Sequence, residues 1–239
     1  MRVLELFAGT HSVGKVAEER GHEVVSLDLQ GSDINIDILK WDYKSAYPEG
    51  YFDYIHASFP CETFSWCRKC YYGKPLKVHN PVWAIPTEDK IIFNEEMYYN
   101  DQKTVGVPLM MKSLEIIEYF KPSYYTMENP FCGDAKVYMP VDIPYTDITY
   151  CKYGFPYKKK TRIWNNLPNY VGRFCKSDCE FMVKTANHKY HLQNCGNQKQ
   201  TKLTQHLKTI EGIKGGGNHR TERYRIPPLL IGSWFDAME

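Results

Sequence analysis

The sequence has 239 residues, 43% hydrophobic and 24% charged, with a formal net charge of +2. These values are typical of a globular protein with one large domain, or one domain and a small appendage. They exclude a long low-complexity or repeat protein, and no apolar run reaches the about 20 residues that a membrane-spanning helix needs.

The first residues run directly into a strand pattern, without the apolar region and cleavage site of a signal peptide. We therefore expect a cytoplasmic or nuclear protein that does not contact membranes, in which the eight cysteines are thiols or metal ligands rather than disulfide partners. Basic residues gather at 158–162 and 199–225, which favours a polyanionic partner. We also expect a monomer.

The N-terminal segment has the pattern of a ribose-binding unit. A β-rich run over 2–7 leads into a turn containing Gly9, a predicted helix over 13–20 and a strand over 23–27 that ends in Asp28. Glycine lets the backbone approach a ligand closely, and an acid about 20 residues later can accept both ribose hydroxyls. His11 stands where a second glycine is usual, and this turn alone does not choose between cofactors.

A third short strand is predicted over 33–39, with acids near its end. Asp37 can accept a hydrogen bond from an adenine amino group at the rim of the same crevice. The alternative interpretation is an acid in a surface loop.

The fourth predicted strand, over 51–56, leads to Cys61, and Pro60 fixes the direction of the backbone before it. Chemistry in open α/β sheets takes place at the carboxyl ends of strands. Cys61 is therefore a candidate nucleophile, and the alternative is a small buried residue.

A helix is predicted over 107–120, with Leu109, Met110, Leu114, Ile117 and Phe120 on its buried face. The fifth strand, over 123–127, then brings Glu128 to the edge where Cys61 lies. A carboxyl group beside a nucleophilic thiol can act as a general acid or stabilise charge that develops on the substrate. Otherwise Glu128 is a strand-end acid that caps the next turn.

Four motifs occur in the order seen in DNA (cytosine-5) methyltransferases: Phe7-Ala8-Gly9, Asp28, Pro60-Cys61-x-x-Phe64-Ser65 and Glu128-Asn129. The chain resembles most the short single-domain members found in viruses, phages and some algae. The resemblance covers residues 1–168 and the C-terminal helix. It implies a Rossmann-like, doubly wound α/β fold with a mostly parallel sheet.

The resemblance also implies an activity: transfer of a methyl group from S-adenosylmethionine to carbon five of a flipped-out cytosine, through a covalent bond to Cys61. Lys160-Thr161-Arg162 resembles the family's Arg-x-Arg motif, with lysine in the first place. Arg162 would then bind the cytosine carbonyl, and Lys160 would hold phosphate or the catalytic Glu128. The alternative for this pair is a solvated basic edge strand. Pro130 replaces the family's usual valine.

By the same resemblance, the segment over 66–106 would be a mobile loop that closes over the base. The C-terminal helix would return beside the first strand. S-adenosylmethionine would be held by a set of residues around the first and fourth strands: Phe7, Gly9, Thr10, His11, Ser12, Asp28, Asp37 and Pro60.

We expect three parts: a catalytic core over 1–164, a small target-recognition region over 165–220, and a C-terminal helix over 221–239. The middle part is too polar to bury much apolar surface, and a zinc ion would explain how it folds. The candidate ligands are Cys175, Cys179, His188 and Cys195, with His191 competing for one place. Otherwise these are separate thiols and surface histidines.

The expected partner is double-stranded DNA. Nothing in residues 165–220 chooses DNA over RNA, so an RNA cytosine-5 methyltransferase stays open. So does a non-catalytic nucleic-acid-binding protein on the same fold, because of His11, Pro130 and Lys160.

Overall fold

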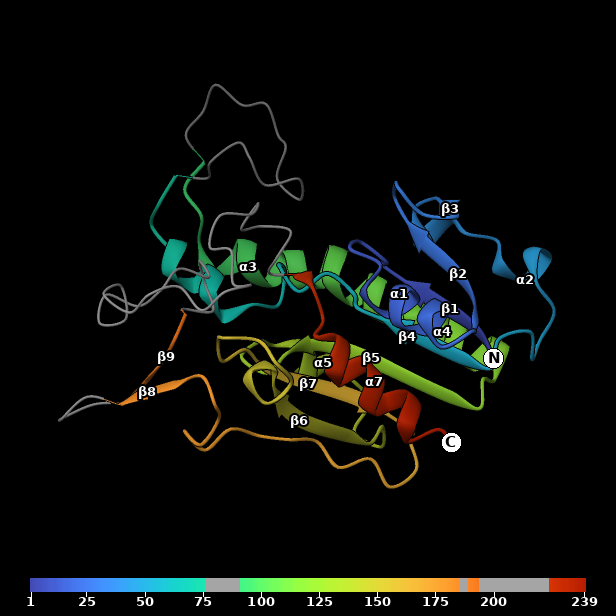
Figure 1. Cartoon of the computed structure of the whole chain (residues 1–239). Helices are drawn as coiled ribbons and strands as arrows, with labels where there is room; N and C mark the ends of the chain where they lie inside the picture. Colours follow the sequence, from blue (N-terminus) through green and yellow to red (C-terminus); the bar gives the residue numbers. More distant parts are fainter. Residues whose placement is uncertain (76–90, 185–188, 194–223) are drawn as a thin grey trace.

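Seven strands form a single sheet in the computed structural model, which describes residues 1–75, 91–184, 189–193 and 224–239. The strand order is β3-β2-β1-β4-β5-β7-β6 (Figure 1). The strands are β1 (Arg2–Leu6), β2 (Glu23–Asp28), β3 (Ile34–Asn35), β4 (Tyr54–Ala57), β5 (Tyr124–Pro130), β6 (Tyr145–Thr149) and β7 (Lys160–Asn165). The first five pair in parallel, and β7 runs antiparallel to both β5 and β6. This is the expected Rossmann-like, mostly parallel α/β fold.

Helices cover both faces of the sheet, as a parallel sheet requires. On one face α1 (Ser12–Glu19) and α7 (Pro228–Asp236) pack against β1, β4 and β5 (Figure 1). The other face holds a second core beneath α2 (Tyr43–Ala46), α4 (Val107–Phe120) and α5 (Ala135–Tyr138). The central strands β1 and β4 are buried almost throughout, which explains why their sequences are mainly apolar apart from Glu5 and His56.

The remaining elements are short. Three are 3-10 helices, one is a π-helix, one is an α-helix, and two form a separate hairpin. They are η1 (Ile38–Lys40), η2 (Trp66–Tyr71), η5 (Tyr150–Lys152), η4 (Gln102–Gly106), α3 (Glu95–Asp101), β8 (Met182–Lys184) and β9 (Lys189–His191). No helix in the described ranges is both long and apolar enough to cross a membrane.

The prediction of a helix over 107–120 is confirmed, but its buried face is rotated. Met110, Ser113, Ile116 and Phe120 are the buried residues, whereas Leu109, Leu114 and Ile117 are only partly buried. The predicted third strand over 33–39 is too long, because only Ile34 and Asn35 form β3. Asp37 caps η1 by accepting a hydrogen bond from the Leu39 backbone N–H, which ends the extended conformation.

A buried histidine lies in the middle of β4. His56 is 1% exposed and bonds to Thr126 Oγ1 through Nδ1 (2.8 Å) and to Ser58 Oγ through Nε2 (2.8 Å). Its ring stacks on Trp234 of α7, with centroids 5.4 Å apart. Burial lowers the pKa of His56 to about 3.

His56 therefore makes the fold sensitive to acid. Its ordinary pKa is 6.5, so the neutral ring contributes fully above that pH, and the contribution is lost as pH falls toward about 3. We expect His56→Gln to remove up to about 1.4 kcal/mol per pH unit from the acid dependence of the free energy of unfolding in this window. Urea unfolding of both proteins at neutral and acidic pH measures it. If the free energy of unfolding changed with pH equally in both proteins, His56 would not be a buried neutral histidine.

Candidate active site

Four chain segments meet at one edge of the sheet. Because β4, β5 and β6 all run in the same direction, their carboxyl ends share this edge. The antiparallel β7 begins there, with Lys160 opposite Thr149 and Thr161 opposite Pro130. This edge is where open α/β sheets place their ligands.

Cys61 lies four residues beyond the end of β4, at the start of a tight turn. Its carbonyl accepts hydrogen bonds from the backbone N–H groups of Phe64 (3.1 Å) and Ser65 (3.0 Å). Burial raises the pKa of the Cys61 thiol to about 12, and the charges of Glu62 and Glu128 act in the same direction. The Lys159 ammonium acts against them. Without a ligand the thiol is therefore protonated at neutral pH.

Glu128, 6% exposed at the end of β5, has two donors on a single oxygen. Tyr150 Oη donates to Glu128 Oε1 at 3.0 Å, and Lys159 Nζ lies 3.3 Å from the same atom. Burial lowers the pKa of Lys159, but Glu128 together with Tyr150, Cys61 and Tyr157 outweighs this and holds the pKa well above its ordinary value. Burial and the Glu128 charge also raise the pKa of Tyr150, which keeps its hydroxyl proton. Glu128 is thus a buried carboxylate held by a cation and a phenol.

Lys160 and Arg162 share a face of β7, as predicted, but it is not the face of Glu128. Glu128 is opposite Ile163 in the sheet, and alternation places Lys159 and Thr161 on that same side. The cation at Glu128 is therefore Lys159, not the expected Lys160, which is exposed. Arg162 instead forms two hydrogen bonds with Asp147 (2.7 and 2.8 Å) and lies 3.6 Å from the ring centre of Tyr145.

Asn129 links β5 to the turn after β4. Its Nδ2 donates to the carbonyl oxygen of Phe59 at 2.9 Å, and the residue is 1% exposed. The bond reaches from the end of β5 to the residue before Pro60. It therefore fixes the turn that carries Cys61.

The turn after β1 is strained in a way typical of ligand sites. Phe7, Gly9 and His11 all have positive φ, at 59°, 47° and 52°. That conformation costs a glycine little but is rare for phenylalanine, so the surrounding structure must impose it. The His11 ring is 2.8 Å from the carbonyl oxygen of Gly31 through Nε2, which ties the turn to the loop after β2 and compensates for the missing glycine.

A carboxylate occupies the amino end of α1. Glu5, 3% exposed in β1, accepts hydrogen bonds from the backbone N–H groups of Val13 and Gly14, both at 2.9 Å. In dinucleotide-binding folds a pyrophosphate takes this position. The turn is therefore shaped for a ligand whose nearest group is not phosphate.

Asp28 lies at the carboxyl end of β2, directly beside this turn. Its Oδ2 accepts from the Gly9 N–H at 2.9 Å and its Oδ1 from the Leu29 N–H at 2.6 Å. Each carboxylate oxygen still has a free lone pair for a ribose hydroxyl. Ser12 Oγ bonds to Thr10 Oγ1 (2.8 Å) and accepts from the backbone N–H of Ile226 (3.2 Å), so the chain before α7 closes this side.

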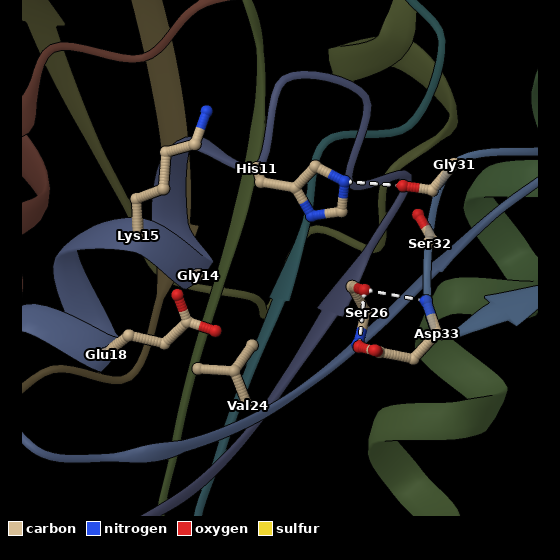
Figure 2. Close-up of a pocket in the computed structure, with 9 residues that line it drawn as sticks. All are labelled: His11, Gly14, Lys15, Glu18, Val24, Ser26, Gly31, Ser32 and Asp33. Carbon is tan, nitrogen blue, oxygen red and sulfur yellow. Dashed lines mark hydrogen bonds between the residues drawn. The ribbon is translucent and has the colours of Figure 1, made fainter.

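A cavity of about 410 Å³ opens beside α1, and Figure 2 shows the residues around it. Its wall contains His11, Lys15 and Glu18 from the turn and α1, and Ser26 and Asp33 from the β2 side. Only His11 belongs to the expected cofactor set, and neither Cys61 nor Asp28 lines the cavity. The cavity is a groove on the flank of the turn, separate from the edge where Cys61 and Glu128 meet.

The expected metal ligands are only partly within the described residues. Cys175 and Cys179 come together, but with Cys151 and His191, and the four ligand atoms all lie within 4.8 Å of one another. His188 and Cys195 lie outside the described residues. Cys151, at the end of β6, is 24 residues from Cys175 in the sequence and belongs to no recognisable ligand spacing with it.

The sequence analysis missed Lys159, Tyr150, Asn129 and Glu5 as parts of the site. Lys159 lies in a run of three lysines, and only the sheet register shows which of them faces Glu128. Glu5 carried a signal that could have found it: an acid inside an otherwise apolar strand, just before a glycine turn.

The seven-stranded, mostly parallel sheet with Cys61 and Glu128 at one edge and a strained glycine turn after β1 is the arrangement of an α/β methyltransferase fold. A curated protein of Frog virus 3 (isolate Goorha), "Probable DNA (cytosine-5)-methyltransferase", is 33% identical over 241 residues, covering 99% of each chain. The chain therefore belongs to the DNA (cytosine-5)-methyltransferase family, which confirms the resemblance seen in its motifs. No protein-family model matches the sequence.

Solved structures with related folds are more distant. The methyltransferase EhMeth of Entamoeba histolytica is 10% identical, with 78% of this chain and 61% of that one covered and a TM-score of 0.47. A mutant DNMT2 of Spodoptera frugiperda is 16% identical, with 73% and 55% covered and a TM-score of 0.39. The chain thus spans less than two thirds of either structure.

The charges around Cys61 predict opposite effects of two substitutions. Glu62→Gln removes a negative charge, so the pKa of Cys61 should fall and its alkylation by iodoacetamide at mildly alkaline pH should accelerate, by about threefold for half a pKa unit. Lys159→Gln removes the positive charge and should slow the reaction. Mass spectrometry of the Cys61 peptide separates this thiol from the exposed Cys67 and Cys70. Equal rates in all three proteins would contradict this electrostatic environment.

Proposed function

We propose that this protein methylates carbon five of cytosine in DNA, with S-adenosylmethionine as donor and Cys61 as covalent nucleophile. The observation that carries the proposal is that the neighbouring strands β4 and β5 bring Cys61 and Glu128 to one sheet edge, where the charges of Glu128 and Lys159 act on the thiol. The name of the viral relative, matched over the whole chain, supports the same assignment.

The reaction begins with the loss of the thiol proton of Cys61. Burial disfavours the thiolate, so we expect the proton to pass to solvent only as the pyrimidine binds and sulfur begins to bond to the ring. The positive charge of Lys159 favours that thiolate. Sulfur then bonds to ring carbon six, and the electrons of the carbon five–carbon six double bond become available at carbon five.

Glu128 would anchor the ring during attack. Tyr150 and Lys159 both donate to Oε1 of Glu128, and within the described part of the chain no hydrogen bond is made to its Oε2. Oε2 is therefore available to accept a hydrogen bond from the amino group of the base or, once protonated, to donate one to ring nitrogen three. Charge that develops there is stabilised by the nearby Lys159, in a site that excludes water.

When bound, S-adenosylmethionine would supply an electrophilic methyl group to carbon five and leave as S-adenosylhomocysteine. Carbon five would then lose its proton to solvent as the bond to Cys61 breaks and the thiolate leaves. The chain fits this donor better than a dinucleotide, because Glu5 occupies the helix end that a pyrophosphate would need. Asp28 would hold the ribose hydroxyls, and Asp37, half-buried beside β3, the adenine amino group. Phe7, Gly9, Thr10, His11, Ser12 and Pro60 would shape the rest of this site.

Access to the ring requires a flipped base, because carbons five and six are covered inside the duplex stack. Exposed Lys160 and half-buried Arg162 lie on the face of β7 opposite Glu128, and we expect them to contact phosphate. DNA binding should therefore weaken as salt increases.

Covalent trapping tests the proposal. DNA that contains 5-fluorocytosine should form an adduct that survives denaturation, depends on S-adenosylmethionine and is absent in Cys61→Ser. Glu128→Gln should lower the rate of methyl transfer about 10²- to 10⁴-fold. Denaturing electrophoresis and methyl incorporation measure the two effects.

The same assay decides between the alternatives. An adduct with RNA and not DNA would contradict the DNA substrate and favour an RNA cytosine-5 methyltransferase. Specific binding without an adduct on either would contradict catalysis and favour a binding protein.

Tyr150→Phe tests the role assigned to the phenol at Glu128. A hydrogen bond to a charged group contributes about 1.5–3 kcal/mol, so we expect kcat to fall about tenfold or more with little change in KM for DNA. Tyr153→Phe is a matched control, since it removes a hydroxyl that bonds to the backbone of Arg173 and not to Glu128. Equal effects of the two substitutions on kcat would contradict the role of Tyr150.

A further inference from the structure

Three cysteines and one histidine converge beyond the end of β6. Cys151 lies in η5, Cys175 and Cys179 in the loop after β7, and His191 at the end of β9. All three thiols are free, and the four ligand atoms lie within 4.8 Å of one another. We propose that these four residues bind one structural zinc ion.

The geometry suits a tetrahedral metal. With Zn–S bonds of about 2.3 Å and a Zn–N bond of about 2.0–2.1 Å, ligand atoms around one zinc lie about 3.5–3.8 Å apart. Cys175 Sγ and His191 Nε2 are 3.6 Å apart. Three thiolates and one imidazole fill all four positions, which is the pattern of structural and not catalytic zinc.

The surroundings of the four residues position them for a metal. The Cys175 backbone is held on both sides: its N–H donates to Thr149 Oγ1 at 2.8 Å, and its carbonyl accepts from Lys158 Nζ at 2.8 Å. Lys152 Nζ forms an ion pair with Asp178 (3.0 Å), a residue that lies between Cys175 and Cys179 in the sequence. A zinc with three thiolates has a net charge of −1, and Lys158 provides compensating positive charge, because Lys152 is already paired with Asp178.

The segment that carries the ligands has little else to fold around. The hairpin of β8 and β9 has three residues in each strand, and a hairpin of this size is not stable alone. Among the described residues its apolar cluster consists of the three cysteines themselves, with Phe181 and Met182 partly buried against them. A metal would supply the folding free energy that this core lacks.

Zinc binding would also affect the active site. Tyr150 and Cys151 are consecutive in η5, and Tyr150 donates to Glu128 while Cys151 faces the cluster. Zinc would thus fix the short helix that positions the phenol. This second part rests on the proposed function, whereas zinc binding itself does not.

Metal content of the full-length protein, purified under reducing conditions, tests the site. We expect about one zinc per chain by mass spectrometry, and a cobalt(II)-substituted protein with the thiolate charge-transfer and visible bands of a tetrahedral site. Cys179→Ser and His191→Ala should lose the zinc, while His191→Cys, which restores a ligand, should keep it. Cys70→Ser is the control, because Cys70 is exposed and outside the cluster.

Several results would overturn the proposal. One is a folded wild-type protein, with all thiols reduced, that stays metal-free in the presence of zinc. Another is zinc that survives in Cys179→Ser and His191→Ala, or cobalt spectra without thiolate bands. The cobalt spectra use the wild-type protein, so they decide even if the variants fail to fold. Variants that lose zinc but keep the wild-type kcat would overturn only the link to Tyr150.

Discussion

A buried ion pair between Glu128 and Lys159 determines how the active edge is built. Taking both charges out of water is costly, and their attraction compensates only when geometry is good and other hydrogen bonds complete it. Here the side chains are 8% and 15% exposed, and the Tyr150 hydroxyl provides the additional bond to the carboxylate. Such an arrangement contributes little net stability, so its presence beside a cysteine is better explained by chemistry.

The topology of the sheet explains how four distant segments reach this point. Parallel strands β4, β5 and β6 all end at one edge, where they bring Cys61, Glu128 and Tyr150. Only an antiparallel strand can begin at the same edge, and β7 does so, which places Lys159 immediately before it. The reversed strand is therefore what allows a cation from the following segment to complete the site.

Much of this could be predicted from sequence, because it depends on local pattern. The strand runs, the glycine turn and the helix over 107–120 each carry a short-range signal, and Cys61 and Glu128 follow directly from strand ends. Lys159 could not be chosen over Lys160, because a one-residue shift in register exchanges the faces of a strand. Tyr150 and Cys151 could not be predicted either, because these consecutive residues of η5 have different partners and neither partner is near in sequence.

The central claim is that Cys61 and the group around Glu128 act together on a single pyrimidine ring. This is tested by exchange of the hydrogen on cytosine carbon five with solvent in the absence of a methyl donor. Sulfur attack on carbon six lets carbon five take up a solvent proton, and loss of the original hydrogen followed by release of sulfur completes the exchange. With DNA tritiated at that position, the account predicts release of tritium by the wild-type protein, none by Cys61→Ser, and strongly reduced release by Glu128→Gln. Release by Cys61→Ser at the wild-type rate would contradict it.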